Sequence, residues 1–139
     1  MLVLSRSESD TFSAGFSLAQ KLCGGSIVLL SGFLGAGKTV FAKGIAAGLG
    51  VAEEVLSPTF QLMREYRAER GLTLYHIDAY RLKNADEAAE AGISEAIGSP
   101  GSVAAVEWHE QIAELFCGRE VVLVTIRPVS ETEREIIIK

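Results

Sequence analysis

The sequence predicts one α/β domain in which helices flank a parallel sheet and antiparallel hairpins extend it. Residues 27–30 and 103–106 form continuous apolar runs, which are typical of strands buried on both faces of a parallel sheet. Segments with apolar residues at helical spacing alternate with these runs. The 139 residues are enough for one compact domain over 1–139 and not comfortably for two.

The N-terminal part is expected to contain two strands and two helices. Residues 2–4 can form a first strand, and polar residues 7–10 supply N-cap candidates for a helix that stops at the glycine pair 24–25. The apolar residues of this helix are Phe12, Phe16, Ala19 and Leu22. A second helix follows the strand 27–30 and ends at Gly50. Its apolar positions are Val40, Phe41, Ile45 and Leu49.

The rest of the chain is expected to contain two hairpins, short helices and one more buried strand. Two alternating runs, 61–66 and 72–80, are joined by a polar turn and predict the first hairpin. Residues 86–97 are alanine-rich and acidic, which predicts one or two short helices broken near Gly92. After the strand 103–106, the expected elements are a helix over 110–116 and a closing hairpin of 120–126 with 135–139.

Charge and cysteine content narrow the classes of function. The formal net charge is −5, so the chain lacks the whole-protein basic field of a nucleic-acid-binding protein and would meet RNA through a partner. Cys23 and Cys117 match no CxxC pattern and are expected to be buried free thiols. The sequence shows neither a signal peptide nor an apolar stretch near the ~20 residues that span a bilayer, so a cytoplasmic location without membrane contact is expected.

One glycine-rich segment carries a specific chemical prediction. Residues 32–39 follow a buried strand, precede a helix and fit the pattern of a phosphate-binding P-loop, Gly-x-x-x-x-Gly-Lys-Thr. Its glycines allow backbone N–H groups to point at phosphate oxygens, and the N-terminus of the helix adds partial positive charge. Lys38 would contact the β- and γ-phosphates, and the Thr39 hydroxyl would ligate Mg²⁺. The fold class that follows is a P-loop NTPase domain.

Such a loop works with acidic residues at the ends of neighbouring strands. Glu107 ends the run 103–106, and Asp78 ends the run 72–78. The first run is the more apolar, which favours Glu107 for Mg²⁺ and Asp78 for positioning or activating water. The sequence alone leaves open which carboxylate binds the metal and which acts on water.

Other residues near these motifs have two interpretations each. The segment 57–59, Ser-Pro-Thr, is either a switch that reaches a γ-phosphate or a plain proline turn. Trp108 directly follows Glu107 and either shapes the site or anchors the core. His76 and His109 lack metal-ligand spacing and are expected to be structural.

These motifs together resemble the TsaE (YjeE-type) ATPases of bacterial tRNA threonylcarbamoyladenosine biosynthesis. The P-loop alone occurs in many families, but its combination with three other motifs is specific. Those three are Ser57-Pro58-Thr59-Phe60, His76-x-Asp78-x-Tyr80-Arg81-Leu82 and Glu107-Trp108. With further matches at Asp10-Thr11, Gly15 and Leu18-Ala19 in the first helix, and at Gly92 with Glu95, the resemblance covers nearly the whole chain. Where the family often has proline after the tryptophan, this chain has His109.

The resemblance implies a P-loop domain with a mixed, largely parallel central sheet, and a bound ATP or ADP with Mg²⁺. It implies a slow ATPase that assists a threonylcarbamoyl transferase subunit (TsaD) and its inactive paralogue (TsaB), and that meets tRNA only through that complex. Metal ligands would be Thr39 and Glu107, and catalytic residues Lys38, Asp78 and Glu107. The implied nucleotide-binding residues are Thr11, Gly32, Phe33, Leu34, Gly35, Ala36, Gly37, Lys38, Thr39, Val40, Thr59, Trp108 and Arg134.

Three other functions compete with this interpretation. A GTPase would usually carry an Asn-Lys-x-Asp motif, which the string 83–86 does not match. A small-molecule kinase would need an arginine-bearing lid, for which only Arg64, Arg67 and Arg70 are candidates. A nucleotide-gated binding module with negligible hydrolysis would use the same residues, so the sequence does not separate it from a slow ATPase.

Overall fold

The computed structural model describes residues 1–33, 37–56 and 62–139. Within these residues one sheet has the strand order β1-β7-β6-β2-β5-β4-β3. Its strands are β1 (Leu2–Ser5), β2 (Ile27–Ser31), β3 (Met63–Arg67), β4 (Thr73–Asp78), β5 (Ser102–Glu107), β6 (Val122–Pro128) and β7 (Arg134–Ile138). The helices are α1 (Glu8–Ala19), α2 (Lys38–Leu49), α3 (Ala85–Glu90) and α4 (Ile93–Ala96), with 3₁₀ segments η1 (Glu69–Gly71) and η2 (His109–Phe116).

The sheet is parallel in its centre and antiparallel at both sides. Strands β6, β2, β5 and β4 pair in parallel, whereas β3 pairs antiparallel with β4, and β7 pairs antiparallel with β6 and β1. The expected mixed, largely parallel α/β sheet with two added hairpins is therefore confirmed. Since parallel strands share one direction, β2, β4 and β5 all end at the same edge of the sheet.

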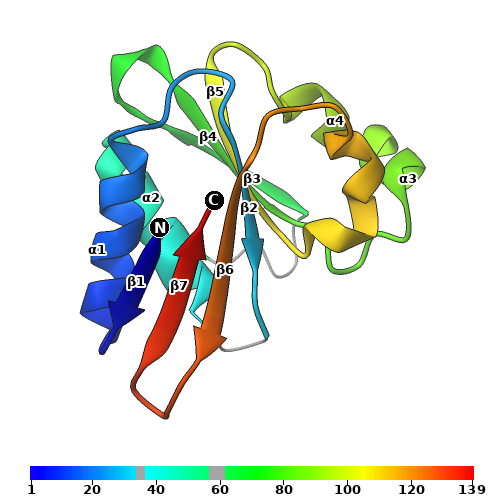
Figure 1. Ribbon diagram of the computed structural model, residues 1–139. Helices are drawn as coiled ribbons and strands as arrows, with labels where there is room; N and C mark the ends of the chain where they lie inside the picture. Colours follow the sequence, from blue (N-terminus) through cyan, green and yellow to red (C-terminus); the bar gives the residue numbers. More distant parts are fainter. Residues whose placement is uncertain (34–36, 57–61) are drawn as a thin grey trace.

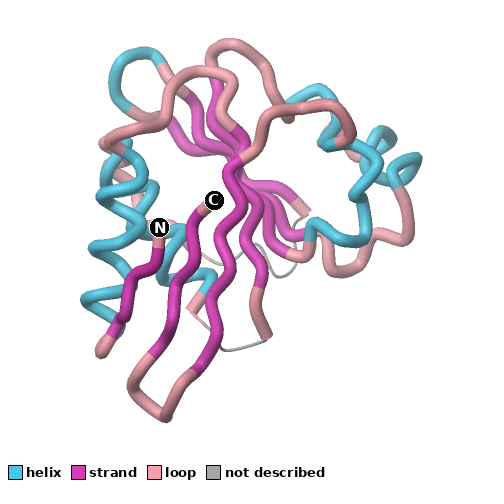
Figure 2. Tube along the Cα trace, in the orientation of Figure 1, coloured by secondary structure: helices cyan, strands magenta, loops and turns pink. Residues whose placement is uncertain are grey.

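Helices cover both faces of the sheet. Figures 1 and 2 show α1 and α2 on one face, and α3, α4 and η2 on the other. Alternate residues of β2 enter the two cores: Val28 and Leu30 pack with Phe41 and Ile45 of α2, whereas Leu29 packs in the opposite cluster. This two-sided burial explains the continuous apolar run of β2, because a central parallel strand has no polar face.

The contact between α1 and α2 depends on glycine. A Cβ atom built on Gly44 of α2 would lie 2.1 Å from the carbonyl oxygen of Phe12, and one on Gly15 of α1 would lie 2.2 Å from that of Phe41. The two backbones therefore touch directly, as only glycine permits. This contact fixes α1, and with it Thr11, against the helix that begins at the predicted phosphate-binding loop.

Replacing Gly44 with alanine is expected to lower the free energy of unfolding by about 1–3 kcal/mol, as overpacking does in other proteins. The sign of this change in unfolding free energy is informative, because a Gly→Ala substitution inside a helix otherwise stabilises the protein by up to about 1 kcal/mol. Urea unfolding followed by circular dichroism measures the change. Gly101→Ala, in the turn before β5, is a control for an added methyl group without a close contact, since its Cβ would meet nothing within 4 Å. An unchanged or higher stability of Gly44→Ala would contradict the close contact.

Three expectations from the sequence are corrected by the structure. Phe12 and Phe16 are 37% and 44% exposed, because the buried face of α1 is the one that carries Thr11, Gly15, Leu18 and Ala19 against α2. The segment expected as a helix over 110–116 is 3₁₀ with a kink at Ile112. Cys23 and Cys117 are exposed free thiols, since Cys23 lies in the connection between α1 and β2 and Cys117 directly follows η2.

Candidate nucleotide site

The predicted phosphate-binding loop connects β2 to α2 at the carboxyl edge of the parallel strands. Gly37 has φ 107° and is the N-cap of α2, a conformation that favours glycine. Phe33 is 78% exposed. The predicted residues Leu34, Gly35 and Ala36, and Thr59 of the predicted switch segment, lie outside the described residues. The strand, the turn glycine and the helix therefore occur in the predicted order.

The N-terminus of α2 lacks the side-chain cap that α1 and α3 have. Ser7 caps α1 and Asn84 caps α3, and both helices carry acidic residues in their first turn. Helix α2 has no side-chain cap and no acidic residue in its first turn. Its first N–H groups and its partial positive charge are thus not neutralised by a side chain of the described residues.

Lys38 is the first residue of α2 and is only 5% exposed. Its Nζ lies 3.8 Å from the ring centroid of Trp108, in cation–π geometry. Burial lowers the pKa of Lys38, and the nearby charges of Glu107, Glu110 and Asp78 oppose that shift. Among the described residues, no carboxylate lies within 4.0 Å of Nζ. The ammonium therefore rests on an aromatic face that it can leave for an anion.

Trp108 is held in an uncommon backbone conformation. Its φ is 58°, in the left-handed region where a bulky residue is strained. The Tyr80 ring packs edge-on against the indole, with centroids 5.0 Å apart and planes at 61°. The side chain predicted to shape the site thus connects Lys38 with the exposed Tyr80, and its strain is of the kind found at functional sites.

The two predicted carboxylates lie next to each other at the ends of β4 and β5. Asp78 and Glu107 are register partners across this parallel pair, and Leu30 near the end of β2 is opposite Glu107 on the other side. Burial raises the pKa of Asp78, and the Glu107 charge adds to this increase. The backbone N–H of Tyr80 donates to Asp78 Oδ1 at 3.0 Å and opposes it. Both acids are therefore brought to the edge where the phosphate-binding loop begins.

Glu107 is buried and makes one short hydrogen bond. Nε2 of His76, in β4, lies 2.6 Å from Glu107 Oε2, and neither side chain is more than 7% exposed. His76 was expected to be structural, and its contact with a predicted site residue was not anticipated. The sequence contains one indication that His76 faces the site: alternate residues of a strand share a face, and His76 precedes Asp78 by two.

Two residues expected near the nucleotide occupy the same end of the molecule. Thr11 is buried, its Oγ1 is 2.7 Å from the Oγ of Ser5, and its Cγ2 would be 3.6 Å from a Cβ on Gly37. Thr11 therefore lies beside the loop. Arg134 begins β7, where its guanidinium donates hydrogen bonds to the carbonyl oxygens of Ser130 and Glu133 in the β6–β7 turn.

The sequence matches a known family. The family model described as Threonylcarbamoyl adenosine biosynthesis protein TsaE matches residues 5–136. This chain belongs to the TsaE family. A relative named tRNA threonylcarbamoyladenosine biosynthesis protein TsaE, from Treponema pallidum, is 40% identical over 136 residues and is matched over 98% of both chains. A relative of the same name from Bacillus subtilis is 42% identical over 112 residues, covering 81% of this chain and 68% of its own.

Solved structures agree with this membership. The crystal structure of Bacillus subtilis YdiB matches this TsaE-family chain with a TM-score of 0.75 at 31% identity, over 98% of this chain and 82% of YdiB. No helix in the described part of the chain is both long and apolar enough to cross a membrane.

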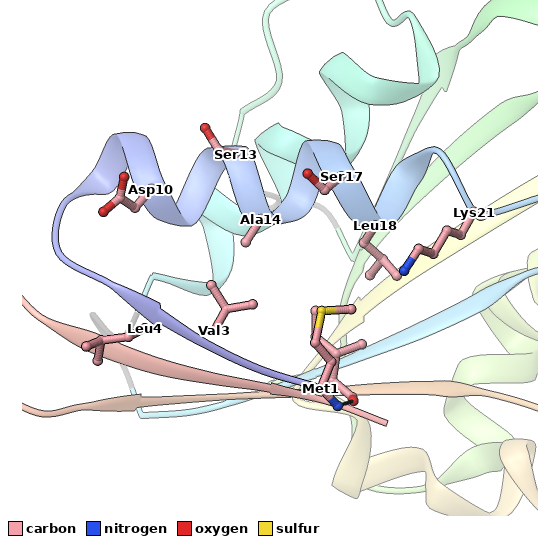
Figure 3. A pocket seen from close by; sticks show the side chains of 10 residues that line it. Met1, Val3, Leu4, Asp10, Ser13, Ala14, Ser17, Leu18 and Lys21 are labelled. Atoms are coloured by element: carbon pink, nitrogen blue, oxygen red, sulfur yellow. Dashed lines mark hydrogen bonds between the residues drawn. The ribbon is translucent and has the colours of Figure 1, made fainter.

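A separate groove lies between β1 and α1 in this TsaE-family fold. The groove has a volume of about 430 Å³. Figure 3 shows Asp10 and Lys21 near its two ends. Val3 and Leu18 line it. None of the residues predicted to bind nucleotide or metal lines this groove, so it is distinct from the site at the ends of β2, β4 and β5.

The second histidine of this TsaE-family chain also contacts the site region. His109 Nε2 lies 2.8 Å from the Oγ of Ser31, the last residue of β2. Burial lowers the pKa of His109, and Glu110 opposes that shift. His109 therefore connects the segment after Trp108 to the strand that leads into the loop.

Proposed function

We propose that this chain is a Mg²⁺-dependent ATPase of tRNA threonylcarbamoyladenosine biosynthesis. The observation that carries the proposal is the N-terminus of α2, which no side chain caps. There, within the described part of the chain, buried Lys38 has no carboxylate within 4.0 Å, and two acids lie at the adjacent strand ends. A cation held in this way, beside free helix N–H groups, suits a polyphosphate. The names of the relatives support a role in tRNA threonylcarbamoyladenosine biosynthesis.

The residues present fit Mg²⁺. Among the described residues no three His, Cys, Asp or Glu side chains converge as a metal-binding group. A protein site for Mg²⁺ does not need such a group, because this ion usually takes one or two protein oxygens, substrate phosphates and waters. The Thr39 hydroxyl in the first turn of α2 and a Glu107 carboxylate oxygen are hard ligands of this kind. When bound, Mg²⁺ would offset negative charge on the β- and γ-phosphates.

Each residue then has a role in hydrolysis. The first N–H groups of α2 bind phosphate oxygens, and Lys38 moves from the Trp108 ring to the β- and γ-phosphates. Asp78 orients water and takes a proton as the water oxygen bonds to the γ-phosphorus and the bond to the β–γ bridging oxygen breaks, leaving its electrons on ADP. Burial raises the pKa of Asp78, which makes it a better proton acceptor than an ordinary aspartate. The alternative, with Glu107 acting on water, is less favoured because Oε2 is engaged by His76.

The biological role follows from the family and the charge of the chain. A net charge of −5 fits a protein that meets tRNA through the transferase subunit TsaD and its paralogue TsaB. In this role the chain does not transfer the threonylcarbamoyl group. Its ATPase cycle allows repeated turnover of the modifying complex in the cytoplasm. A nucleotide-gated module without hydrolysis is the second candidate, favoured by the Lys38–Trp108–Tyr80 contact that joins the site to the surface.

The experiment that tests this function measures ATP hydrolysis with and without Mg²⁺, first on the purified protein and then with TsaD, TsaB and tRNA. Slow Mg²⁺-dependent hydrolysis alone is expected, with more than one modified tRNA per complex only when this protein and ATP are present. Brisk hydrolysis without any effect on modification would overturn the biological role. Transfer of phosphate to an added small molecule instead of water would favour a kinase.

A further inference from the structure

His76 is a polar side chain in an otherwise apolar setting. It is 0% exposed, and its strand neighbours on the same face of β4 and β5 include Leu74 and Ala105. Its Nδ1 is buried and has no hydrogen-bond partner among the described residues. A buried imidazole with one unpaired nitrogen costs free energy relative to an apolar residue. Its one hydrogen bond, to Glu107, therefore calls for an explanation.

The hydrogen bond from His76 restricts the orientation of the Glu107 side chain. Asp78 is opposite Glu107 in register, so His76 reaches Glu107 diagonally from two residues earlier on the same face. The carboxylate accepts, and the Nε2–H donates, over 2.6 Å. One carboxylate oxygen is thereby fixed and the other remains for a ligand. A free glutamate side chain would have to lose rotational freedom on binding a cation, whereas this one has already lost it.

We propose that His76 is a positioning residue that holds the Glu107 carboxylate in the orientation that ligates nucleotide-bound Mg²⁺. This inference rests on the proposed function, and it adds a residue that touches neither the nucleotide nor the metal. Hydrogen-bond partners of metal-ligating carboxylates contribute about 10–100-fold to metal affinity in other proteins. The effect of His76 therefore belongs to the metal-dependent part of nucleotide binding, not to nucleotide binding as such.

The test compares ADP affinity in excess EDTA with ADP affinity in Mg²⁺, by titration calorimetry. The ratio of the two affinities in the native protein is the gain due to Mg²⁺. His76→Asn, whose amide is too short to reach Glu107, should reduce this gain about tenfold or more and leave the affinity in EDTA within about threefold. His76→Gln places an amide N–H near the position of Nε2 and should keep most of the gain.

A structural role for His76 predicts a different result. Leu74→Ala removes a buried side chain from the same face of β4 without touching Glu107, so it should lower the midpoint of thermal unfolding but keep the Mg²⁺ gain. If His76→Asn behaves like Leu74→Ala, the positioning role is overturned and the proposed function stands. If the native protein binds no ADP at all, the proposed function fails, and this inference fails with it.

A measurement on the native protein covers the case in which the variants do not fold. With ¹⁵N-labelled histidine, NMR of a chain with two histidines should show a slowly exchanging proton on Nε2 of the buried imidazole. Adding Mg²⁺ to the ADP-bound protein should shift this signal beyond the shift caused by ADP alone. An Nε2 without a proton, or a signal that Mg²⁺ leaves unchanged, would overturn the inference.

Discussion

Lys38→Ala is expected to abolish tight binding of ATP and ADP. Hydrogen bonds to charged groups contribute about 1.5–3 kcal/mol each, and this ammonium would make two of them, to the β- and γ-phosphates. A loss of about 3 kcal/mol or more corresponds to a drop in affinity of about 100-fold or more. Because the pKa of Lys38 is lowered by burial, an arriving phosphate would also restore the charged form that burial disfavours.

Titration calorimetry with ADP measures this loss in Lys38→Ala, and Trp108 reports the movement of Lys38 in the native protein. Trp108 is the only tryptophan, and Lys38 Nζ lies 3.8 Å from its ring centroid. ADP should therefore change the intrinsic fluorescence of the native protein as the ammonium leaves the indole. Lys43→Ala, five residues further along α2, is the matched control and should titrate like the native protein. Normal ADP affinity in Lys38→Ala would remove the loop at the N-terminus of α2 from the nucleotide site.

The central fold could be predicted because its physical causes are local. A strand buried on both faces must be apolar throughout, and residues 27–30 and 103–106 show this directly. Helix ends were marked by Gly50 and Gly92, both of which adopt positive φ. Asp78 and Glu107 end two of the expected strands, and they lie together because parallel strands of one sheet end on the same side.

The features that could not be predicted depend on contacts between distant segments. The buried face of α1 is set by Gly15 and Gly44, which let two backbones touch, so Phe12 and Phe16 are displaced toward solvent despite their spacing. The left-handed φ of Trp108 has no local sequence cause, since this region is unfavourable for a bulky residue. The His76–Glu107 bond joins residues 31 positions apart, and only the β4–β5 register brings them together.

Asp78→Asn is expected to lower ATP hydrolysis by about 10²–10⁴-fold, the usual effect of removing a general base, with ADP affinity nearly unchanged. Single-turnover hydrolysis at saturating ATP measures the chemical step apart from binding. Asp86→Asn, at an exposed position in the first turn of α3, is the control for loss of an acidic group. If Asp78→Asn retained hydrolysis, the residue that acts on water would be Glu107 and not Asp78.

The stability of the same variant separates a site residue from a structural one. The pKa of Asp78 is raised in the folded protein, so above that pKa its charge favours the unfolded chain, and this penalty disappears as the pH falls through the folded pKa. At neutral pH the neutral amide avoids the penalty, and its oxygen can still accept from the Tyr80 N–H. The thermal midpoint of Asp78→Asn should therefore equal or exceed that of the native protein. A variant that loses hydrolysis but keeps its thermal stability indicates that Asp78 acts in the reaction and not in the fold. If tRNA modification continued with this variant, the partners would depend on bound nucleotide and not on its hydrolysis.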